Sequence, residues 1–476
     1  MAINTVKQIS AVEVDGTSIP LVQPKLASKE IIENGTYLAS NDNVDGYSEV
    51  VINVPSLEEV PTETIDITEN GTYSVLYYAN ANVNVPPVSN EYTLDKHYKT
   101  KVIDYDGTIL YSDTQDVGDA AKDIVLNIKH DGLTLEGFSS NQQTTLLSSL
   151  ENVKKIYNYD EIIGPIYTTT SGMCEFDIVV TKKTGLTVQL NMAGTKSWGD
   201  GASDSTTSHT YAKYGNYTVT CSATSWSITS SNGIVGQLSD SNLRGLLQRA
   251  RLKNVNNSIP AYCFQYCEAL ETVSIPNGIT SLGSYSFSYC KSLKALILPP
   301  TLTTINTYSF NYCLALKALL WPRKTTTIRS QTLNQNKSLT HFTINSNLTR
   351  YYSSDHSLVS NCSGIEELEI PSSQTNIRYQ DYYDCRCLSK IRFWGNITEV
   401  ASSAFYSPNG TTALNMVYFN NNTVVPTLAD TNAFGMLNTN GRIVVPDSLY
   451  DEWITATNWA TYADYIYKKS EVDYYD

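Results

Sequence analysis

The stretch "SLGSYSFSYCKSLKALILPPTLT" (residues 281–303) decides the fold, because the same 23-residue pattern comes before it and after it. The neighbouring units are "SIPAYCFQYCEALETVSIPNGIT" (258–280), "TINTYSFNYCLALKALLWPRKTT" (304–326) and "TIRSQTLNQNKSLTHFTINSNLT" (327–349), and less regular units continue to about residue 425. A single unit of this kind cannot bury its own apolar residues, whereas stacked units form one continuous core. The pattern therefore predicts a solenoid.

Two columns of the aligned units describe the expected core. The cysteine column reads Cys267, Cys290, Cys313, Asn336, Cys362 and Cys385. The residue three positions later is apolar in every unit: Leu270, Leu293, Leu316, Leu339, Ile365 and Leu388. The cysteines recur with the structural period and form no Cys-x-x-Cys pair. We therefore expect them to be small buried residues in a ladder, and not disulfides or metal ligands.

The form Phe-x-x-Cys-x-x-Leu-x-x-Leu-x-Leu-Pro resembles the BspA-type leucine-rich repeat over nearly 200 residues. This resemblance implies a leucine-rich-repeat solenoid in residues 233–446. The segment "SDSNLRGLLQRARL" (239–252) predicts a capping helix at its beginning. The closing segment, 447–476, contains Trp453 and Trp459 and predicts a helical cap over the open end of the solenoid.

Small β modules are expected upstream of the solenoid. Asn-Gly pairs at 34–35 and 70–71 lie in two similar "ENGTY" units, and alternating valines follow each pair, which is typical of hairpins. We expect two such modules in residues 29–90, after an N-terminal attachment segment in residues 1–28. Residues 91–170 resemble the β-grasp-like repeats of the Listeria–Bacteroides type, in which a strand with an Asp-x-Asp-Gly turn precedes a glycine-aromatic segment.

Residues 171–232 contain motifs of a further small domain. The segments "WGDG" (198–201), "HTY" (209–211) and "YGNYTV" (214–219) resemble, in this order, a PKD-type immunoglobulin-like sandwich. The resemblance implies that the glycines form a turn and that the Tyr and Val side chains face a core. A calcium ion at Asp200 is a weaker alternative, because the spaced carboxylates of a dedicated calcium loop are missing.

The segment "VIDYDGTILYS" (102–112) has the Asp-x-Asp-Gly-Thr spacing of haloacid dehalogenase phosphotransferases, in which Asp104 would be a nucleophile and Asp106 an acid. That family also needs alternating strands and helices and several further polar residues downstream. The chain after Asp106 has the pattern of strands and turns instead. We therefore expect a hairpin turn here and no catalytic residue.

Composition narrows the class of protein. Charged residues make up 17% of the chain and tyrosines number 34, which favours strands and predicts a mostly β, multidomain chain. The net charge of -14 argues against nucleic-acid binding. No segment has the roughly 20 apolar residues that membrane insertion needs. No motif indicates an enzyme, a metal site or a cofactor.

The strand of each solenoid unit predicts a binding face, because the side chain between two buried positions points outward. That column reads Ser274, Ile297, Leu320, Thr343, Glu369, Arg392 and Tyr418, and the column two residues earlier reads Thr272, Ala295, Ala318, His341, Glu367 and Lys390. One end is apolar and the other charged, which suits a protein or glycan partner. The predicted ligand-binding residues are Ile297, Leu320, Thr343, Glu369, Arg392, Tyr418, His341 and Lys390. The alternative stays open that Ile297 and Leu320 pack against an adjacent domain or a sister chain.

A tyrosine column is expected on the opposite, turn-rich face of the solenoid. It consists of Tyr266, Tyr289 and Tyr312. These rings could bind sugar rings or stack on each other, and we favour mutual packing.

The modular design suggests a protein that is displayed on a surface. The repeats give the chain its length, and the solenoid offers an extended surface for recognition. The "ENGTY" modules and the repeats resemble proteins of Firmicutes-type bacteria and their tailed phages, and the N-terminus shows no secretory signal pattern. We therefore expect a non-enzymatic virion protein, assembled in the host cytoplasm, in a tail, baseplate or fibre on the particle exterior. A head-decorating fibre and a bacterial cell-surface adhesin are the alternatives. The expected partners are other virion proteins through the N-terminal region and a host-surface glycan or protein through the solenoid, with homo-oligomerisation left open.

Overall fold

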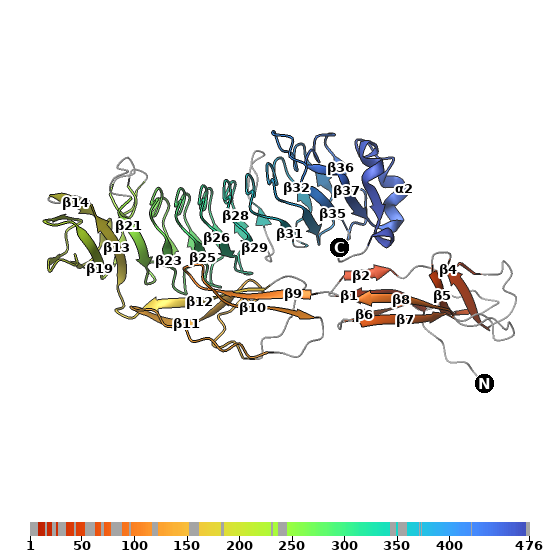
Figure 1. Ribbon diagram of the computed structural model, residues 1–476, viewed down its shortest axis with the longest axis horizontal. Helices are drawn as coiled ribbons and strands as arrows, with labels where there is room; N and C mark the ends of the chain where they lie inside the picture. The colour runs from red at the N-terminus through yellow and green to blue at the C-terminus, as the bar shows by residue number, and fades with distance from the viewer. Residues whose placement is uncertain are drawn as a thin grey trace.

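The computed structural model describes side chains in residues 99–114, 122–151, 161–181, 185–229, 232–236, 245–342, 359–370, 372, 374–419 and 421–472. Outside these ranges it gives the backbone of individual strands. The described chain is almost entirely β: small sheets lead to a sandwich-like module and then to a long solenoid (Figure 1). The mostly β fold class is thereby confirmed.

Within the part of the chain that the structure describes, eight strands precede residue 97. They form a three-stranded sheet, a second three-stranded sheet and a hairpin, with these strands: β1 (Gln8–Val14), β2 (Thr17–Pro20), β6 (Thr62–Ile67); β3 (Lys25–Leu26), β4 (Gly35–Asn41), β5 (Val44–Ile52); β7 (Gly71–Tyr77), β8 (Val88–Leu94). β4 and β5 form an antiparallel pair within the first Asn-Gly unit, but Gly35 begins β4 and pairs with Ile52, so the Asn-Gly pair does not form the turn of this hairpin as expected. In the second unit β7 pairs with β8. The valine run at 82–86 lies outside the described residues.

A four-stranded sheet follows, which we call the central sheet. Its strands, in the order β10-β9-β12-β11, are β9 (His97–Ile103), β10 (Ile109–Asp116), β11 (Leu133–Ser140) and β12 (Glu161–Thr169). β9 and β10 are antiparallel, and Gly107 N donates to Asp104 O (2.9 Å) in the turn between them. Gly107 has φ +88°, a conformation that suits glycine. The predicted hairpin turn is confirmed.

Asp104 does more than mark this turn. Its carboxylate is buried, accepts hydrogen bonds from Tyr105 N (2.8 Å) and the Tyr167 hydroxyl (3.0 Å), and lies 2.7 Å from His130 Nε2. Burial, followed by the charge of Asp104, raises the pKa of Tyr167, so this phenol stays a donor. The carboxylate therefore ties the turn to a strand and a loop far along the chain.

The next module places the WGDG and HTY motif residues together. The Trp198 and Tyr211 side chains are fully buried, and the Tyr211 hydroxyl donates to Trp198 O (2.8 Å). The His209 ring stacks on Trp198 (centroids 5.1 Å apart), and its Nε2 lies 2.7 Å from Asp200 Oδ2. These residues have structural roles, as the PKD-like resemblance implies; membership of that family stays a prediction.

The entrance to the solenoid corrects one expectation. Residues 239–252 were expected to form a capping helix, but β21 (Leu247–Arg251) is a strand, and residues 237–244 lie outside the described part. β21 pairs on one side with β13 (Cys174–Val180) and on the other with β23 (Thr272–Ser274), a strand of the first repeat unit. An available sheet edge therefore overrides the local helical pattern.

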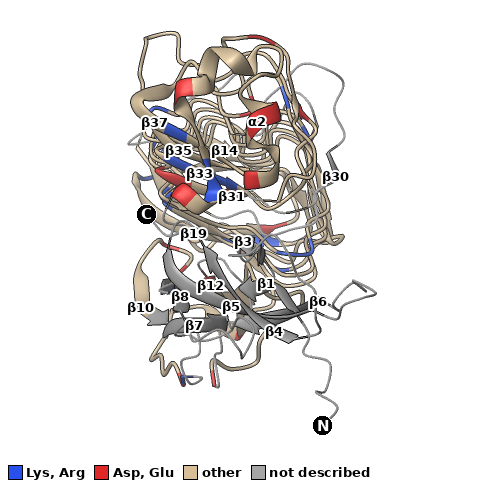
Figure 2. Ribbon diagram, turned by 90° about the vertical axis from the view of Figure 1, so that its right-hand side faces the viewer, with Lys and Arg blue, Asp and Glu red and all other residues tan. Residues whose placement is uncertain are grey.

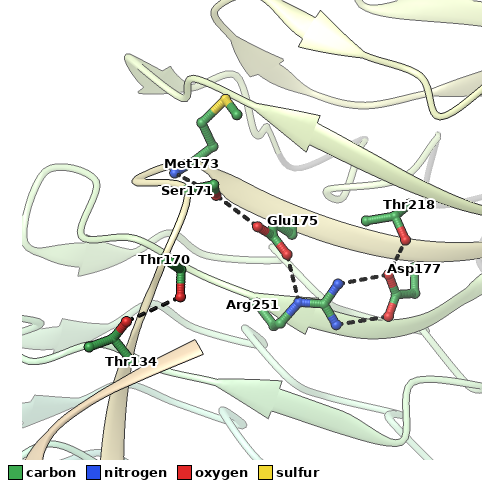
Figure 3. Close-up of polar contacts among 8 residues, drawn as sticks. All are labelled: Thr134, Thr170, Ser171, Met173, Glu175, Asp177, Thr218 and Arg251. Carbon is green, nitrogen blue, oxygen red and sulfur yellow. Dashed lines mark hydrogen bonds and ion pairs between the residues drawn. The ribbon is translucent and has the colours of Figure 1, made fainter. Parts of the chain in front are cut away.

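An ion-pair cluster supports this junction (Figure 3). Arg251 Nε donates to Glu175 Oε2 (2.8 Å), and its two terminal nitrogens donate to the Asp177 carboxylate (both 2.9 Å). A bidentate guanidinium–carboxylate pair is geometrically specific. It joins β13 to β21 and so aligns the module with the solenoid.

Parallel strand ladders form the solenoid. One ladder contains β25 (Ala295–Ile297), β27 (Ala318–Leu320) and β29 (His341–Phe342), with β23 in contact with β25. A second ladder contains β31 (Glu367–Ile370), β33 (Lys390–Phe393), β35 (Leu414–Tyr418), β37 (Leu437–Val445) and β38 (Ile466–Lys468). Shorter two-residue strands form further ladders, from β22 (Ser258–Ile259), β24 (Ser281–Leu282), β26 (Thr304–Ile305), β28 (Thr327–Ile328) and β30 (Thr349–Arg350), and from β32 (Asn376–Ile377), β34 (Glu399–Val400) and β36 (Thr427–Leu428). The solenoid predicted from the 23-residue period is confirmed.

The cysteine ladder is part of this core. Cys290 Sγ donates to Phe264 O (3.1 Å) and Cys313 Sγ donates to Phe287 O (3.1 Å), so each thiol bonds to the preceding turn. All nine cysteines are free thiols. Burial raises the pKa of Cys313 to about 12, which keeps its thiol protonated. The expectation of buried thiols in place of disulfides is confirmed for this ladder.

Short helices and one strand close the far end of the solenoid. The helices are α2 (Tyr450–Trp453) and the 3-10 helices η1 (Asp447–Leu449), η2 (Trp459–Tyr465) and η3 (Lys469–Glu471). Trp453 and Trp459 are fully buried, and their rings lie 5.4 Å and 6.0 Å, between centroids, from Phe419. β38 then extends the sheet beside β37. The cap therefore combines aromatic packing with strand pairing.

Candidate functional site

The outward columns predicted from the sequence are present as strand registers. Ile297 pairs with Leu320, and Glu369 pairs with Arg392, which pairs with Tyr418. We call the surface formed by these outward side chains of β23 to β37 the strand face. Its apolar half lies on β25 and β27 and its charged half on β31, β33, β35 and β37.

The apolar half is covered by the chain's own central sheet, which lies along the first solenoid turns (Figure 1). Ile297 is 2% exposed and Leu320 is 0% exposed. Both belong to one apolar cluster with Ala295 and Ala318 of the solenoid and with Ile103, Ile162 and Ile166 of the central sheet. Because burial hides them, the expectation that Ile297 and Leu320 form an exposed ligand surface is wrong; the open alternative of packing against an adjacent domain describes them.

Gly164 of β12 permits this close approach. A Cβ atom at this position would lie 2.5 Å from Ile297 Cγ2 and 2.8 Å from Ile297 Cδ1, well inside van der Waals contact. The isoleucine side chain therefore occupies the space that a larger residue at 164 would fill.

Polar contacts surround the apolar cluster. The Ser139 hydroxyl donates to Leu298 O (2.8 Å), and Arg323 Nη1 donates to Gln142 O (3.3 Å). Both hydrogen bonds join the central sheet region to the solenoid across more than a hundred residues of sequence. The two parts are thus held by apolar burial with directional bonds at its edge.

The charged half brings several predicted residues together. Arg392 Nη1 lies 3.6 Å from Glu369 Oε1, and its guanidinium lies over the Tyr418 ring, 4.7 Å from the centroid. Lys390 is half-buried and pairs in register with Glu367. Tyr418 itself is buried, against Val444 and Val472, so it supports the arginine and is not an exposed contact residue.

Arg442 extends this charged half and was not among the predicted residues. It is exposed, lies beside Met416 in register, and its guanidinium lies 5.3 Å from the centroid of the Tyr467 ring. Lysine and arginine residues lie on β33 and β37 at this end of the molecule (Figure 2). The irregular spacing of the last units hides Arg442 from a 23-residue alignment.

The remaining predicted residues do not join this group. His341 is half-buried, and its Nδ1 lies 2.8 Å from the Thr340 hydroxyl. Burial and, next, the nearby Lys101 lower the pKa of His341, so the ring stays neutral at physiological pH. Ser274 is buried, and Thr343 lies outside the described residues. Ligand binding by Glu369, Arg392, His341 and Lys390 stays a prediction.

The turn-rich side of the solenoid, which we call the turn face, contains two tyrosine ladders. The centroid distances are 4.8 Å for Tyr266–Tyr289, 4.6 Å for Tyr289–Tyr312, 5.5 Å for Tyr262–Tyr285 and 4.9 Å for Tyr285–Tyr308. All these tyrosines have positive φ, a rare conformation repeated in each turn. The rings pack on each other, as favoured from the sequence, so sugars cannot stack between them.

The ladder of Tyr262, Tyr285 and Tyr308 was missed, although its members also recur every 23 residues.

Among the described residues, no group of three His, Cys, Asp or Glu side chains converges in the way a metal ion requires. Asp200 directs its carboxylate to His209 and to Ala202 N. Within the same part of the chain, no helix has the length and apolar character to cross a bilayer.

Comparison with known proteins identifies the repeats. Six copies of the BspA-type leucine-rich repeat region match residues 257–356 and 351–434. No curated protein matches the chain.

Several solved structures are similar to part of the chain. A leucine-rich repeat protein of T. pallidum is 21% identical to it, and the match covers 31% of this chain and 66% of the T. pallidum chain (TM-score 0.27). The pneumococcal vaccine antigen PcpA is 18% identical, and the match covers 36% of this chain and 40% of the PcpA chain (TM-score 0.27). A leucine-rich cell surface protein of Faecalibacterium prausnitzii is 17% identical, and the match covers 43% of this chain and 74% of that protein (TM-score 0.16). The chain thus spans just under two thirds of the first of these proteins and well under half of the second.

Proposed function

We propose that this BspA-type leucine-rich repeat protein is a non-enzymatic binding protein displayed on a surface, whose solenoid recognises a glycan or a protein on a cell. The single observation that carries the proposal is the charged half of the strand face. There the outward side chains of successive strands form rows of fixed spacing, which suits an extended partner.

The geometry of this charged half favours a role in binding a partner over a purely structural role in packing. Cation–π contacts hold the guanidinium groups of Arg392 and Arg442 over tyrosine rings, which limits their freedom before a partner arrives. Arg442 on β37 and Glu367 on β31 are exposed and present opposite charges on one sheet, with β33 and β35 between them. Such mixed charge selects partners of complementary charge and speeds their association.

Replacing Arg442 by glutamate should weaken binding of the full chain to its target cells about tenfold, because it reverses one exposed charge of the face. Flow cytometry with labelled full-length protein measures this binding. The matched control is Arg329→Glu, which reverses an exposed charge elsewhere on the solenoid. Equal binding by the wild type and Arg442→Glu would place recognition outside this face, and no binding by the wild type to any cell tested would contradict the function itself.

The setting of the display is part of the proposal. The repeat match supports a surface-binding role and gives no support to a virion, so we put the surface of a bacterial cell first and the exterior of a phage particle second. In the second setting the N-terminal region would bind other virion proteins. Immunogold labelling of intact cells and of purified particles separates the two: label on cells alone supports the first setting, and label on particles alone overturns it.

A further inference from the structure

A small polar pocket lies on the turn face, where the tyrosine ladder ends. The column of Tyr266, Tyr289 and Tyr312 continues in the next turns as Gln335, Asn361 and Asp384. All six residues have positive φ, between 54° and 66°, so their backbones are equivalent. The backbone geometry of the ladder therefore persists while its chemistry changes from aromatic to polar.

Pairs of residues from three successive turns line the pocket. They are Gln335 with Lys337, Asn361 with Ser363, and Asp384 with Arg386, and they enclose about 250 Å³. This lies below the range of about 300–1,000 Å³ that holds drug-sized ligands. The pocket is thus suited to one small unit of a ligand and not to an extended chain.

Asp384 is the buried anchor of the pocket, at 7% exposure. Its carboxylate accepts hydrogen bonds from Arg386 Nε (3.0 Å) and Nη2 (2.8 Å) and from the Ser407 hydroxyl (2.7 Å). Burial raises the pKa of Asp384, but these hydrogen bonds and the charges of Arg386 and Lys337 outweigh it and hold the pKa below its ordinary value. The carboxylate is therefore ionised and held in one orientation.

The charges of the lining favour an anionic ligand. Lys337 and Arg386 contribute two positive charges and Asp384 one negative charge, so one positive charge is in excess. The bidentate contact joins Nε and Nη2 of Arg386 to Oδ1 and Oδ2 of Asp384. Lys337 is exposed on the opposite turn of the pocket. An ammonium group beside the amides of Gln335 and Asn361 offers a carboxylate a charge-assisted hydrogen bond and offers hydroxyl groups both donors and acceptors.

Tyrosines occur in the turns at both ends of the pocket, although none of them is among its lining residues. Tyr312, the last ring of its ladder, precedes Gln335, and it is stacked against Tyr289 on the side away from the pocket. At the other end, Tyr383 of the Asp384 turn and Tyr406 of the next turn have rings 6.1 Å apart, and Tyr379, also in the Asp384 turn, is 42% exposed. Tyrosine offers an apolar ring with a polar tip, which suits the mixed surface of a sugar ring.

We propose that this pocket binds one sugar unit bearing a carboxylate, as in acidic cell-surface glycans. The carboxylate lies against Lys337, and the sugar hydroxyls bond to Gln335, Asn361 and Asp384. This inference rests on the proposed surface-binding function and identifies a second recognition surface for it, on the turn face.

The test titrates the full-length protein with glucuronic acid and with N-acetylneuraminic acid by ligand-observed NMR, with glucose as the neutral reference. We expect millimolar binding of at least one acidic sugar, and binding about tenfold weaker for Lys337→Gln, because a charge-assisted hydrogen bond is lost. Lys337 is exposed, so its replacement should leave the fold intact. The matched control, Lys324→Gln, changes another exposed lysine of the solenoid and should bind like the wild type.

Two results would overturn the pocket proposal: no binding of either acidic sugar, or equal binding by the wild type and Lys337→Gln. The cell-binding assay on the same variants separates this failure from failure of the proposed function. If wild-type protein binds cells but no acidic sugar, the surface-binding function stands without this pocket.

Discussion

Replacing Gly164 by valine is expected to separate the central sheet from the solenoid and to lower the free energy of unfolding by about 3 kcal/mol. The cause is steric. A Cβ at this position would lie 2.5 Å from Ile297 Cγ2, and valine adds two methyl groups to that overlap. The Ile297 side chain lies in the closed cluster formed with Ile103, Ile162 and Ile166, where it has no room to move. Urea denaturation followed by tryptophan fluorescence measures the loss.

A double-mutant cycle isolates the contact. Gly164→Ala adds only the overlapping Cβ, and Ile297→Ala removes the atoms that it meets. We expect the two changes together to cost at least about 1 kcal/mol less than the sum of their separate costs. Additive costs, with Gly164→Ala as stable as the wild type, would mean that β12 does not lie on Ile297.

The second large effect is expected on deleting residues 1–170. The remaining chain, 171–476, exposes the apolar half of the strand face: Ala295, Ile297, Ala318 and Leu320. Loss of burial for Ile297 and Leu320 costs about 2 kcal/mol each, and the bare patch favours association between copies. We expect 171–476 to elute as aggregates in size-exclusion chromatography and to bind the dye ANS, while the control chain 97–476 stays monodisperse or forms one defined oligomer.

A second variant tests whether the uncovered apolar patch causes the aggregation. Changing Ile297 and Leu320 to threonine in the 171–476 chain should restore solubility, because it makes the uncovered patch polar. The same two changes in the full chain should destabilise it, because they place hydroxyl groups in a closed apolar cluster. Soluble, dye-free 171–476 without these two changes would show that the solenoid does not need the central sheet.

The solenoid was predictable because its information is local and repeated. The cysteine and leucine columns report burial directly, and the registers Glu369–Arg392–Tyr418 follow from strand alternation. The turn at Asp106-Gly107 was predictable for the same reason, since Asp-Gly between two alternating segments specifies a hairpin.

Contacts between distant parts of the chain were not predictable in this way. Strand alternation shows that Ile297 and Leu320 point away from the solenoid core, but not whether solvent or another sheet lies there. The sequence of β12, EIIGPIYTT, could have indicated that the central sheet covers these residues. It is apolar without alternation, as in a strand that is buried on both faces. The prediction of a helix over 239–252 was wrong for the same reason. The local pattern carries no information about the edge of β13, with which β21 pairs.

The most direct measurement of the internal interface is photo-crosslinking from a diazirine-bearing leucine analogue at position 320 of the full chain. Leu320 is 0% exposed and lies in the cluster that contains Ile103, Ile162 and Ile166. Mass spectrometry should find intramolecular cross-links to peptides that contain these isoleucines. Cross-links to a second protein or to a second copy, with none to residues 97–169, would contradict the internal interface and restore this half of the strand face as a binding surface.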